Sequence, residues 1–462
     1  MKTTSALDSP ARITACADRQ PLNPLDIALR SVDLTIRGMG YPGFETQMLV
    51  WLAGRIDTPR LRHAIGRLVR RHPTITARLV EDSTRKSAAP YWQPQPEIEP
   101  RLEEVDLSSD EPERVVACAE ELLSIPHDPA QGNSLRFHLL HRPDGRDVFL
   151  LQYNHVLMDN RATVLLLQEL DQLCKAPGSL DDQPCVESRN LVSKRLRPVS
   201  HADRRKGALA AVELQGYALR GRAAILGTGE EDKPRRVKLR IATRTIDPEL
   251  TRAIQLRGVQ LCGLPSLSMT ILACAFRAIR ALGPESRNAG RNYVAGIGLD
   301  LNVRGIGQAL LQNMASVVPI TARPGDLADR DLLVRALSRQ VRDRLEAKID
   351  LGVLRLARVF QRRPRHIHWV LEYMLRWSYS LWYAYFGALD AVRQLCDVPV
   401  EQIYYVGPTW SPIGLSLLAN QYRGRLLLQA TYDPELIVPP LGEQMLDTIS
   451  ADLSAFATDS SR

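Results

Sequence analysis

The octapeptide Tyr153-Asn154-His155-Val156-Leu157-Met158-Asp159-Asn160 lies between two regular patterns. Residues 148–153, which lead into it, are apolar except for Gln152, and residues 162–173 after it repeat apolar positions at helical spacing. A short apolar run indicates a buried strand, so the segment predicts a strand, a turn and a helix. In mixed α/β folds, chemistry tends to lie where a buried strand ends. A histidine there is able to take or give a proton near neutral pH, which makes His155 the first catalytic candidate.

Strands and helices alternate on both sides of this segment. Apolar periodicity predicts further helices over residues 58–71, with Thr58 as the capping residue, and over 113–123, 248–261, 266–282, 332–348 and 440–456. Apolar runs predict strands over residues 47–52, 76–80, 134–141, 147–153, 237–246, 292–301, 316–321 and 426–432. The alternation predicts a fold of the α/β or α+β class.

The chain of 462 residues is too long for one ordinary core, so we expect two subdomains. Between about residues 175 and 206 the composition shifts to Pro, Gly, Ser, Asp and Arg, which is typical of a linker. We therefore predict a flexible tail over residues 1–20, an N-terminal subdomain over 21–175, a linker over 176–207 and a C-terminal subdomain over 208–462.

The composition is that of a globular protein and does not indicate a secretory signal or a membrane-spanning helix. A hydrophobic fraction of 45% and a charged fraction of 24% are globular values. The N-terminus lacks the apolar core of a signal peptide, and no uncharged apolar stretch is long enough to predict a spanning helix. The net charge of +8 suits a partner that carries phosphates, but the arginines that produce it are spread along the chain.

Short motifs in the sequence predict neither a metal site nor a dinucleotide site, and they leave His155 as the catalytic candidate. Seven cysteines are scattered without a C-x-x-C pair, which predicts no metal site and favours an intracellular, reducing location in the cytoplasm. The sequence Gly38-x-Gly40-x-x-Gly43 matches a dinucleotide fingerprint, but Pro42 interrupts it and a strand pattern follows, so we interpret it as a turn. Among the nine histidines, only His155 has an aspartate four residues later.

Residues 367–391 are rich in aromatic side chains. They include Trp369, Tyr373, Trp377, Tyr379, Trp382, Tyr383, Tyr385 and Phe386. The simplest interpretation is a buried core segment. Two alternatives remain open: a wall for an apolar acyl substrate, or a peripheral contact with a membrane surface.

The region around the octapeptide resembles the centre of the condensation-domain-type acyltransferases, which form the chloramphenicol acetyltransferase-like superfamily. The resemblance is carried in order by Ile125-Pro126-His127-Asp128, Asn133-Ser134-Leu135-Arg136, two strands and Asn154-His155-x-x-x-Asp159-Asn160. The family motif is His-His-x-x-x-Asp-Gly. The suspected branch is that of the wax ester synthases and polyketide-associated acyltransferases, because Asn23-Pro24-Leu25-Asp26 resembles the start of wax ester synthases. Weaker matches to the wider family extend over most of the chain: Arg71-His72-Pro73, Gly298–Arg304, Asn313, Val317-Val318-Pro319, Gly414-Leu415-Ser416 and Gly424-Arg425-Leu426.

This resemblance implies two similar subdomains, each a mixed sheet flanked by helices, with an active-site tunnel between them. It implies that His155 is the general base and that Asp159 shapes the turn. Arg304, Asn313 and Trp410 are the candidates for the tunnel wall. No metal and no bound cofactor are implied; the co-substrate is a coenzyme A or phosphopantetheine thioester.

The chain departs from the family motif at three positions. Asn154 replaces the first histidine. Asn160 replaces the glycine, and we expect it to adopt a left-handed backbone. The arginine that pairs with the motif aspartate aligns with Thr76, for which Arg78 or Arg304 are the possible substitutes.

Three functions follow as hypotheses. The first is an acyltransferase that moves an acyl group from acyl-coenzyme A or an acyl-carrier protein to an alcohol or amine acceptor. The second, motivated by the three departures, is a non-catalytic module that binds a carrier protein or an acyl ligand. The third, a nucleic-acid-binding protein, rests on charge alone, and the lack of a basic patch interleaved with aromatic residues counts against it.

Overall fold

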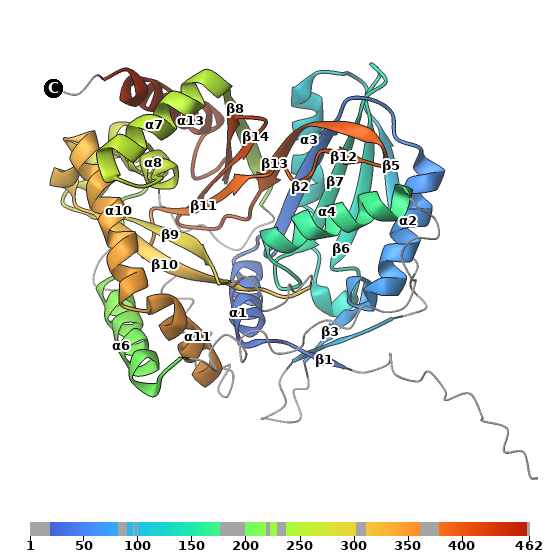
Figure 1. Cartoon of the computed structure of the whole chain (residues 1–462), viewed down its shortest axis with the longest axis horizontal. Coiled ribbons are helices and arrows are strands. Elements are labelled where there is room, and N and C mark those ends of the chain that lie inside the picture. Colours follow the sequence, from blue (N-terminus) through green and yellow to red (C-terminus); the bar gives the residue numbers. More distant parts are fainter. Residues whose placement is uncertain are drawn as a thin grey trace, which may run out of the picture.

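The computed structural model describes residues 19–81, 90–95, 98, 100–175, 199–218, 222–228, 237–301, 311–360 and 378–459. Two six-stranded sheets lie side by side and helices pack around them (Figure 1). This is the mixed α/β architecture of two subdomains that the sequence predicts. A small three-stranded sheet adds β1 (Gln20–Pro21), β4 (Tyr91–Gln93) and β3 (Arg78–Val80).

The N-terminal sheet carries the octapeptide. Its strand order is β12 (Gln394–Leu395), β13 (Val398–Val406), β2 (Glu45–Leu52), β7 (Asp147–Asn154), β6 (Leu135–His141) and β5 (Leu102–Asp106). Every residue of β7 is buried, because it is a central strand with β2 and β6 as antiparallel neighbours. The helices of this half are α1 (Pro24–Gly38), α2 (Thr58–Arg71), α3 (Pro112–Leu123) and α4 (Asn160–Lys175).

The second sheet has the order β10 (Ala315–Ala322), β9 (Tyr293–Asp300), β11 (Leu381–Ala388), β14 (Leu415–Tyr422), β15 (Arg425–Tyr432) and β8 (Arg240–Ile246). The aromatic segment, where described, forms β11, which runs parallel to β9 and β14 in the middle of this sheet. Trp369, Tyr373 and Trp377 lie outside the described residues. The helices described in this half are α6 (His201–Ala218), α7 (Pro248–Cys262), α8 (Leu267–Leu282), α9 (Glu285–Asn288), α10 (Arg330–Glu346), α11 (Ile349–Phe360) and α13 (Pro439–Thr458).

One segment crosses between the halves. Strands β12 and β13 come from the predicted C-terminal subdomain, residues 208–462, but β13 pairs with β2 of the N-terminal sheet (Figure 1). An unpaired edge at β2 would leave backbone N–H and C=O groups exposed, and β13 supplies their partners. The two sheets therefore do not divide at the predicted linker, most of which, residues 176–198, lies outside the described residues.

The crossing segment also pairs two cysteines that the sequence gives no reason to join. Cys174 near the end of α4 and Cys396 between β12 and β13 form a disulfide, with Cα atoms 5.0 Å apart and a sequence separation of 222. Cys118 and Cys274 are buried thiols, as their apolar surroundings predict.

Local sequence explains most helix boundaries, with one correction. Asp57 caps α2, because its side chain accepts a hydrogen bond from the Arg60 N–H (3.1 Å); the predicted cap, Thr58, is the first helical residue. No helix in the described part of the chain is by itself long and apolar enough to cross a membrane. Helices α7 and α8 satisfy that criterion only jointly, across a 97° bend.

Candidate active site

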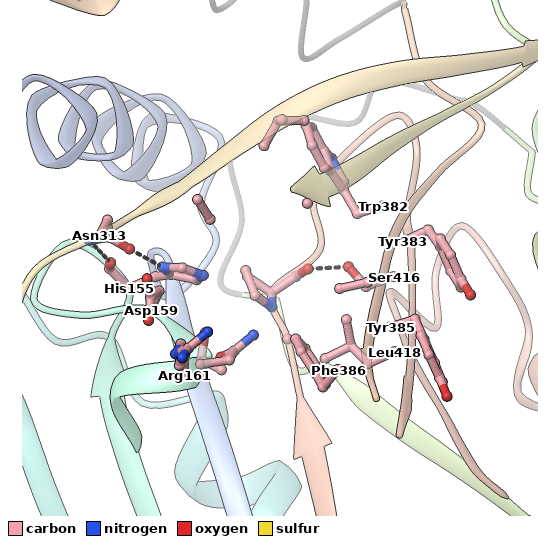
Figure 2. Close-up of a pocket in the computed structure, with 18 of the residues that line it drawn as sticks. His155, Asp159, Arg161, Asn313, Trp382, Tyr383, Tyr385, Phe386, Ser416 and Leu418 are labelled. Atoms are coloured by element: carbon pink, nitrogen blue, oxygen red, sulfur yellow. Dashed lines mark hydrogen bonds between the residues drawn. The ribbon is translucent and has the colours of Figure 1, made fainter. Parts of the chain in front are cut away.

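A cavity of about 440 Å³ lies between the two sheets, and the turn after β7 forms part of its wall (Figure 2). Of the motif and tunnel residues predicted from the sequence, the cavity is lined by His155, Asp159, Asn160, Asn313 and Trp410. Asn154 lies fully buried beside them, and Arg304 lies outside the described residues. The turn between Gly38 and Gly43 is no nucleotide site: Gly43 has a φ of +117°, and strand β2 rather than a helix follows.

His155 is held on three sides. Its backbone N–H donates to the Phe44 carbonyl (2.8 Å), and its ring stacks on the Phe44 ring with centroids 5.0 Å apart. The ring Nδ1 lies 3.1 Å from Oδ1 of Asn313. Figure 2 shows the other ring nitrogen, Nε2, turned away from Asn313 toward the cavity. In the part of the chain that the structure describes, Nε2 has no hydrogen-bond partner, so it is free to meet a substrate.

The environment of His155 favours the neutral ring. Burial lowers the pKa of His155 below its usual value, and the contacts with its own carbonyl and with Asp159 and Asn313 offset this only in part. A neutral imidazole with a hydrogen-bonded Nδ1–H presents its lone pair at Nε2. A neutral imidazole in this position is chemically able to accept a proton at Nε2.

Asn154 does not line the cavity; its side chain supports the turn through hydrogen bonds. Its Nδ2 donates to Oδ1 of Asp33 (3.1 Å) and to Oε1 of Glu45 (3.0 Å), and its Oδ1 accepts from the Val156 N–H (3.0 Å). Burial raises the pKa of Glu45, while Arg136 and Asn154 oppose the rise. An asparagine in place of the family's first histidine thus satisfies two buried carboxyl groups and a backbone donor.

Asp159 joins the turn to the other half of the molecule. Its carboxylate accepts from the Ala162 N–H (3.0 Å) at the start of α4 and from the Met314 N–H (2.9 Å) just before β10. Burial raises the pKa of Asp159, and these two bonds lower it. Among the described residues, backbone N–H groups are the hydrogen-bond donors to the Asp159 carboxylate. Thr76 ends a 3-10 helix, Pro73–Thr76, and Arg78 pairs with Gln93, so neither of them contacts Asp159.

The expectation of a left-handed backbone at Asn160 is wrong, because Asn160 is the first residue of α4 and is not among the described residues with positive φ. Its Oδ1 accepts from the Tyr153 hydroxyl and its carbonyl accepts from the Tyr405 hydroxyl (3.0 Å). No glycine is required where the backbone is helical.

The wall opposite His155 is aromatic and comes mostly from β11. The ring centroids of Trp382 and Trp410 lie 5.1 Å apart, and Tyr379 packs on Trp382 at 4.7 Å. Phe386 and Leu418 extend this wall (Figure 2). Trp382 fits because position 296 on β9 is glycine: a Cβ there would lie 2.6 Å from Cζ3 of the indole. The composition of residues 367–391 leaves a buried core segment and a substrate wall as alternatives, and the fold places Trp382 and Phe386 on the cavity lining.

One ion pair on the cavity wall was not foreseen from the sequence. Arg161 of α4 and Asp300 at the end of β9 are half-exposed, and their Nη1 and Oδ2 atoms lie 2.6 Å apart. The pair joins the two halves at the solvent-facing side of the cavity. An ion pair between two half-exposed charges contributes little to stability.

Comparison with known proteins agrees with this architecture. Residues 42–186, which include the octapeptide, match the family model of the Condensation domain. No curated protein matches the chain. The first condensation domain of the calcium-dependent antibiotic synthetase, in complex with a substrate analogue, superposes with a TM-score of 0.72 at 15% identity, over 96% of this chain and 97% of that one.

Two further structures are similar over nearly the whole chain. The trichothecene 15-O-acetyltransferase of Fusarium sporotrichioides has a TM-score of 0.71 at 11% identity, covering 95% of both chains. The epimerization domain from the third module of tyrocidine synthetase B has a TM-score of 0.67 at 12% identity, covering 95% of this chain and 96% of that one.

These findings define the class of the protein. Its fold is the two-subdomain fold of condensation domains, and the resemblance to the chloramphenicol acetyltransferase-like superfamily is confirmed at the level of the fold. Because the structures named above carry different activities, the fold does not select a reaction, and the argument for one must come from the site.

Proposed function

We propose that this protein is an acyltransferase that moves an acyl group from a thioester to a hydroxyl or amine acceptor, with His155 as the general base. The observation that carries the proposal is the open Nε2 of His155 at the wall of a 440 Å³ cavity, with Nδ1 held by Asn313. A cavity of this size is typical of a site for small molecules.

In the proposed reaction, Nε2 of His155 takes the proton of the acceptor hydroxyl or amine as the acceptor atom attacks the thioester carbonyl carbon. A new C–O or C–N bond forms and the C–S bond breaks. The thiolate that leaves takes the proton back from the imidazolium. This second proton transfer returns His155 to its neutral form, which its lowered pKa favours.

The aromatic wall supports an apolar acyl group as the transferred group. Trp382, Trp410 and Phe386 line the cavity with flat, water-excluding surfaces. We assign coenzyme A or the phosphopantetheine arm of an acyl-carrier protein as the thiol carrier of the donor. The acceptor is an alcohol or an amine.

The departures at Asn154 and Asn160 no longer favour a non-catalytic binding module. Each of these residues makes hydrogen bonds that support the turn bearing His155. A degenerate site would be expected to lose such support.

The test is thiol release from a series of acyl-coenzyme A donors, from acetyl to palmitoyl, with a pool of alcohols and amines as acceptors. The same series is repeated with acyl-carrier-protein donors. Release that requires an acceptor, rises with acyl chain length and disappears in His155→Ala supports the proposal. Tight binding of donors of both kinds without any acyl product would refute it and favour the binding module.

A further inference from the structure

Asp26, on the first turn of α1, contacts neither His155 nor the cavity. It does contact Asn313, which in turn contacts the His155 ring. The Asp26 side chain is 3% exposed and makes no ion pair with a lysine or arginine in the described part of the chain. Its Oδ2 accepts from the Asn23 N–H (3.0 Å), which is the usual contact of a capping box. Its Oδ1 instead accepts from both the backbone N–H (3.1 Å) and the side-chain Nδ2 (2.9 Å) of Asn313.

These bonds fix which way the Asn313 amide points. Three acceptors surround one end of that amide: Oδ1 of Asp26 and the carbonyls of His155 (2.9 Å) and Val156 (3.3 Å). An amide nitrogen only donates and an amide oxygen only accepts, so the nitrogen must occupy this end. The oxygen then faces Nδ1 of His155 at 3.1 Å.

The orientation of the amide acts on the tautomer of the imidazole, together with the contact between the ring and the His155 carbonyl. An acceptor 3.1 Å from Nδ1 stabilises the ring with its proton on Nδ1 and leaves the lone pair on Nε2, toward the cavity. A reversed amide would present N–H groups to Nδ1 and place the proton on Nε2, where the ring could not act as a base. The chain of contacts runs from Asp26 through Asn313 to His155.

We propose that Asp26 is a positioning residue that fixes the base-competent tautomer of His155 through the side chain of Asn313. This inference rests on the proposed function, in which Nε2 of His155 takes the acceptor proton. It assigns to α1 a role in the reaction beyond the start of a helix.

The carboxylate form of Asp26 is the form that performs this role, because both of its oxygens already accept hydrogen bonds. Burial raises the pKa of Asp26 to about 7, and the bonds from Asn313 and Asn23 oppose that rise. The charged group that acts on it from a packed element is Asp159, in the turn after β7, which raises the pKa further. Below this pH a proton on Asp26 removes an acceptor and loosens Asn313.

The test combines a structural readout with kinetics on the full-length protein. Proton-coupled ¹⁵N spectra of protein labelled at histidine report the tautomer of each ring, and His155→Gln identifies the His155 signals. Wild type should show the Nδ1–H tautomer at pH 8. Asp26→Asn should show a mixture of the two His155 tautomers, with kcat lowered at least tenfold and the KM for the donor little changed. In wild type, kcat/KM should fall as the pH drops below about 7, the pKa of Asp26. In Asp26→Asn this fall should move to a pH below the usual histidine pKa.

The matched control is Asp326→Asn, which changes the carboxylate that accepts the Arg323 N–H (2.8 Å) in another capping box and is not among the residues that line the cavity. It should leave the tautomer, kcat and the acid limb as in wild type. If Asp26→Asn does not fold, the His155 tautomer is measured in Asn313→Ala instead. A pure Nδ1–H tautomer in the folded variant, with kcat and the acid limb unchanged, would overturn the inference.

The two proposals fail in different ways. The tautomer measurement needs no substrate, so it judges Asp26 even when no donor is turned over. The absence of acyl transfer from every donor would count against the proposed function instead.

Discussion

The ring of Phe44 stacks on the imidazole of His155, with centroids 5.0 Å apart and planes inclined by 18°. The same residue accepts the His155 backbone N–H and donates its own N–H to Asp33 (2.7 Å). Phe44 therefore anchors the backbone and covers one face of the ring. The contact links the start of β2 to the end of β7, two neighbouring strands of one sheet.

Replacing Phe44 with leucine should lower kcat about tenfold, because a branched side chain removes the flat surface that aligns the imidazole. The backbone contacts of residue 44 remain, so the thermal midpoint should change little. Steady-state kinetics and a thermal melt of Phe44→Leu measure both quantities. A kcat within twofold of wild type would show that the stacking has no role in alignment.

Replacing Asp159 with alanine should destabilise the fold by about 3 kcal/mol, because the Met314 and Ala162 N–H groups lose a charged acceptor in a buried place. Denaturant unfolding measures the free energy. The matched control is Asp300→Ala on the same cavity wall, whose half-exposed ion pair with Arg161 is worth no more than about 1 kcal/mol. Equal losses for the two variants would contradict the structural role of Asp159.

Replacing Asn154 with leucine should cost about 2–3 kcal/mol of stability, although the two side chains are similar in size. The change removes the donor shared by Asp33 and Glu45 and leaves both buried carboxyl groups short of a partner. Denaturant unfolding again provides the measurement. A loss below about 0.5 kcal/mol would mean that the carboxyl groups find other partners, since surface changes of that size are common.

Replacing Gly296 with alanine should reduce kcat/KM for long acyl donors at least tenfold. The new methyl group would lie 2.6 Å from Cζ3 of Trp382, so the indole must move into the cavity. Gly298→Ala is a matched control on the same face of β9, because a Cβ at position 298 meets no atom within 4 Å. Tryptophan fluorescence reports the displacement. Equal kinetics for the two variants would argue against an acyl site at this wall.

The elements around the octapeptide could be predicted from sequence, because their signals are local. The apolar run and the helical pattern give β7 and α4 with boundaries within two residues. The aromatic composition of residues 367–391 leaves a core segment and a substrate wall as alternatives, and part of this segment forms β11. The identity of His155 and Asp159 as candidates followed from their spacing and from the family motif.

The contacts that complete the site could not be predicted in this way, because they join residues far apart in the chain. Asn313 lies 158 residues from His155 and 287 from Asp26, and neither apolar periodicity nor a motif reports such a pairing. The stretch Asn23-Pro24-Leu25-Asp26 is a helix start and a weak match to the family, and neither signal reports a contact with Asn313. The crossing of β13 to β2 depends likewise on the three-dimensional arrangement of the sheets.

The central claim is that Nε2 of His155 accepts the proton of the acceptor during acyl transfer. The most direct measurement is the single-turnover rate of acyl transfer for wild type, His155→Ala and the exposed-site control His63→Ala, each checked for an unchanged thermal melt. The account predicts a rate about 10²–10⁴-fold lower for His155→Ala and a wild-type rate for His63→Ala. A rate for folded His155→Ala within a few-fold of wild type would contradict it.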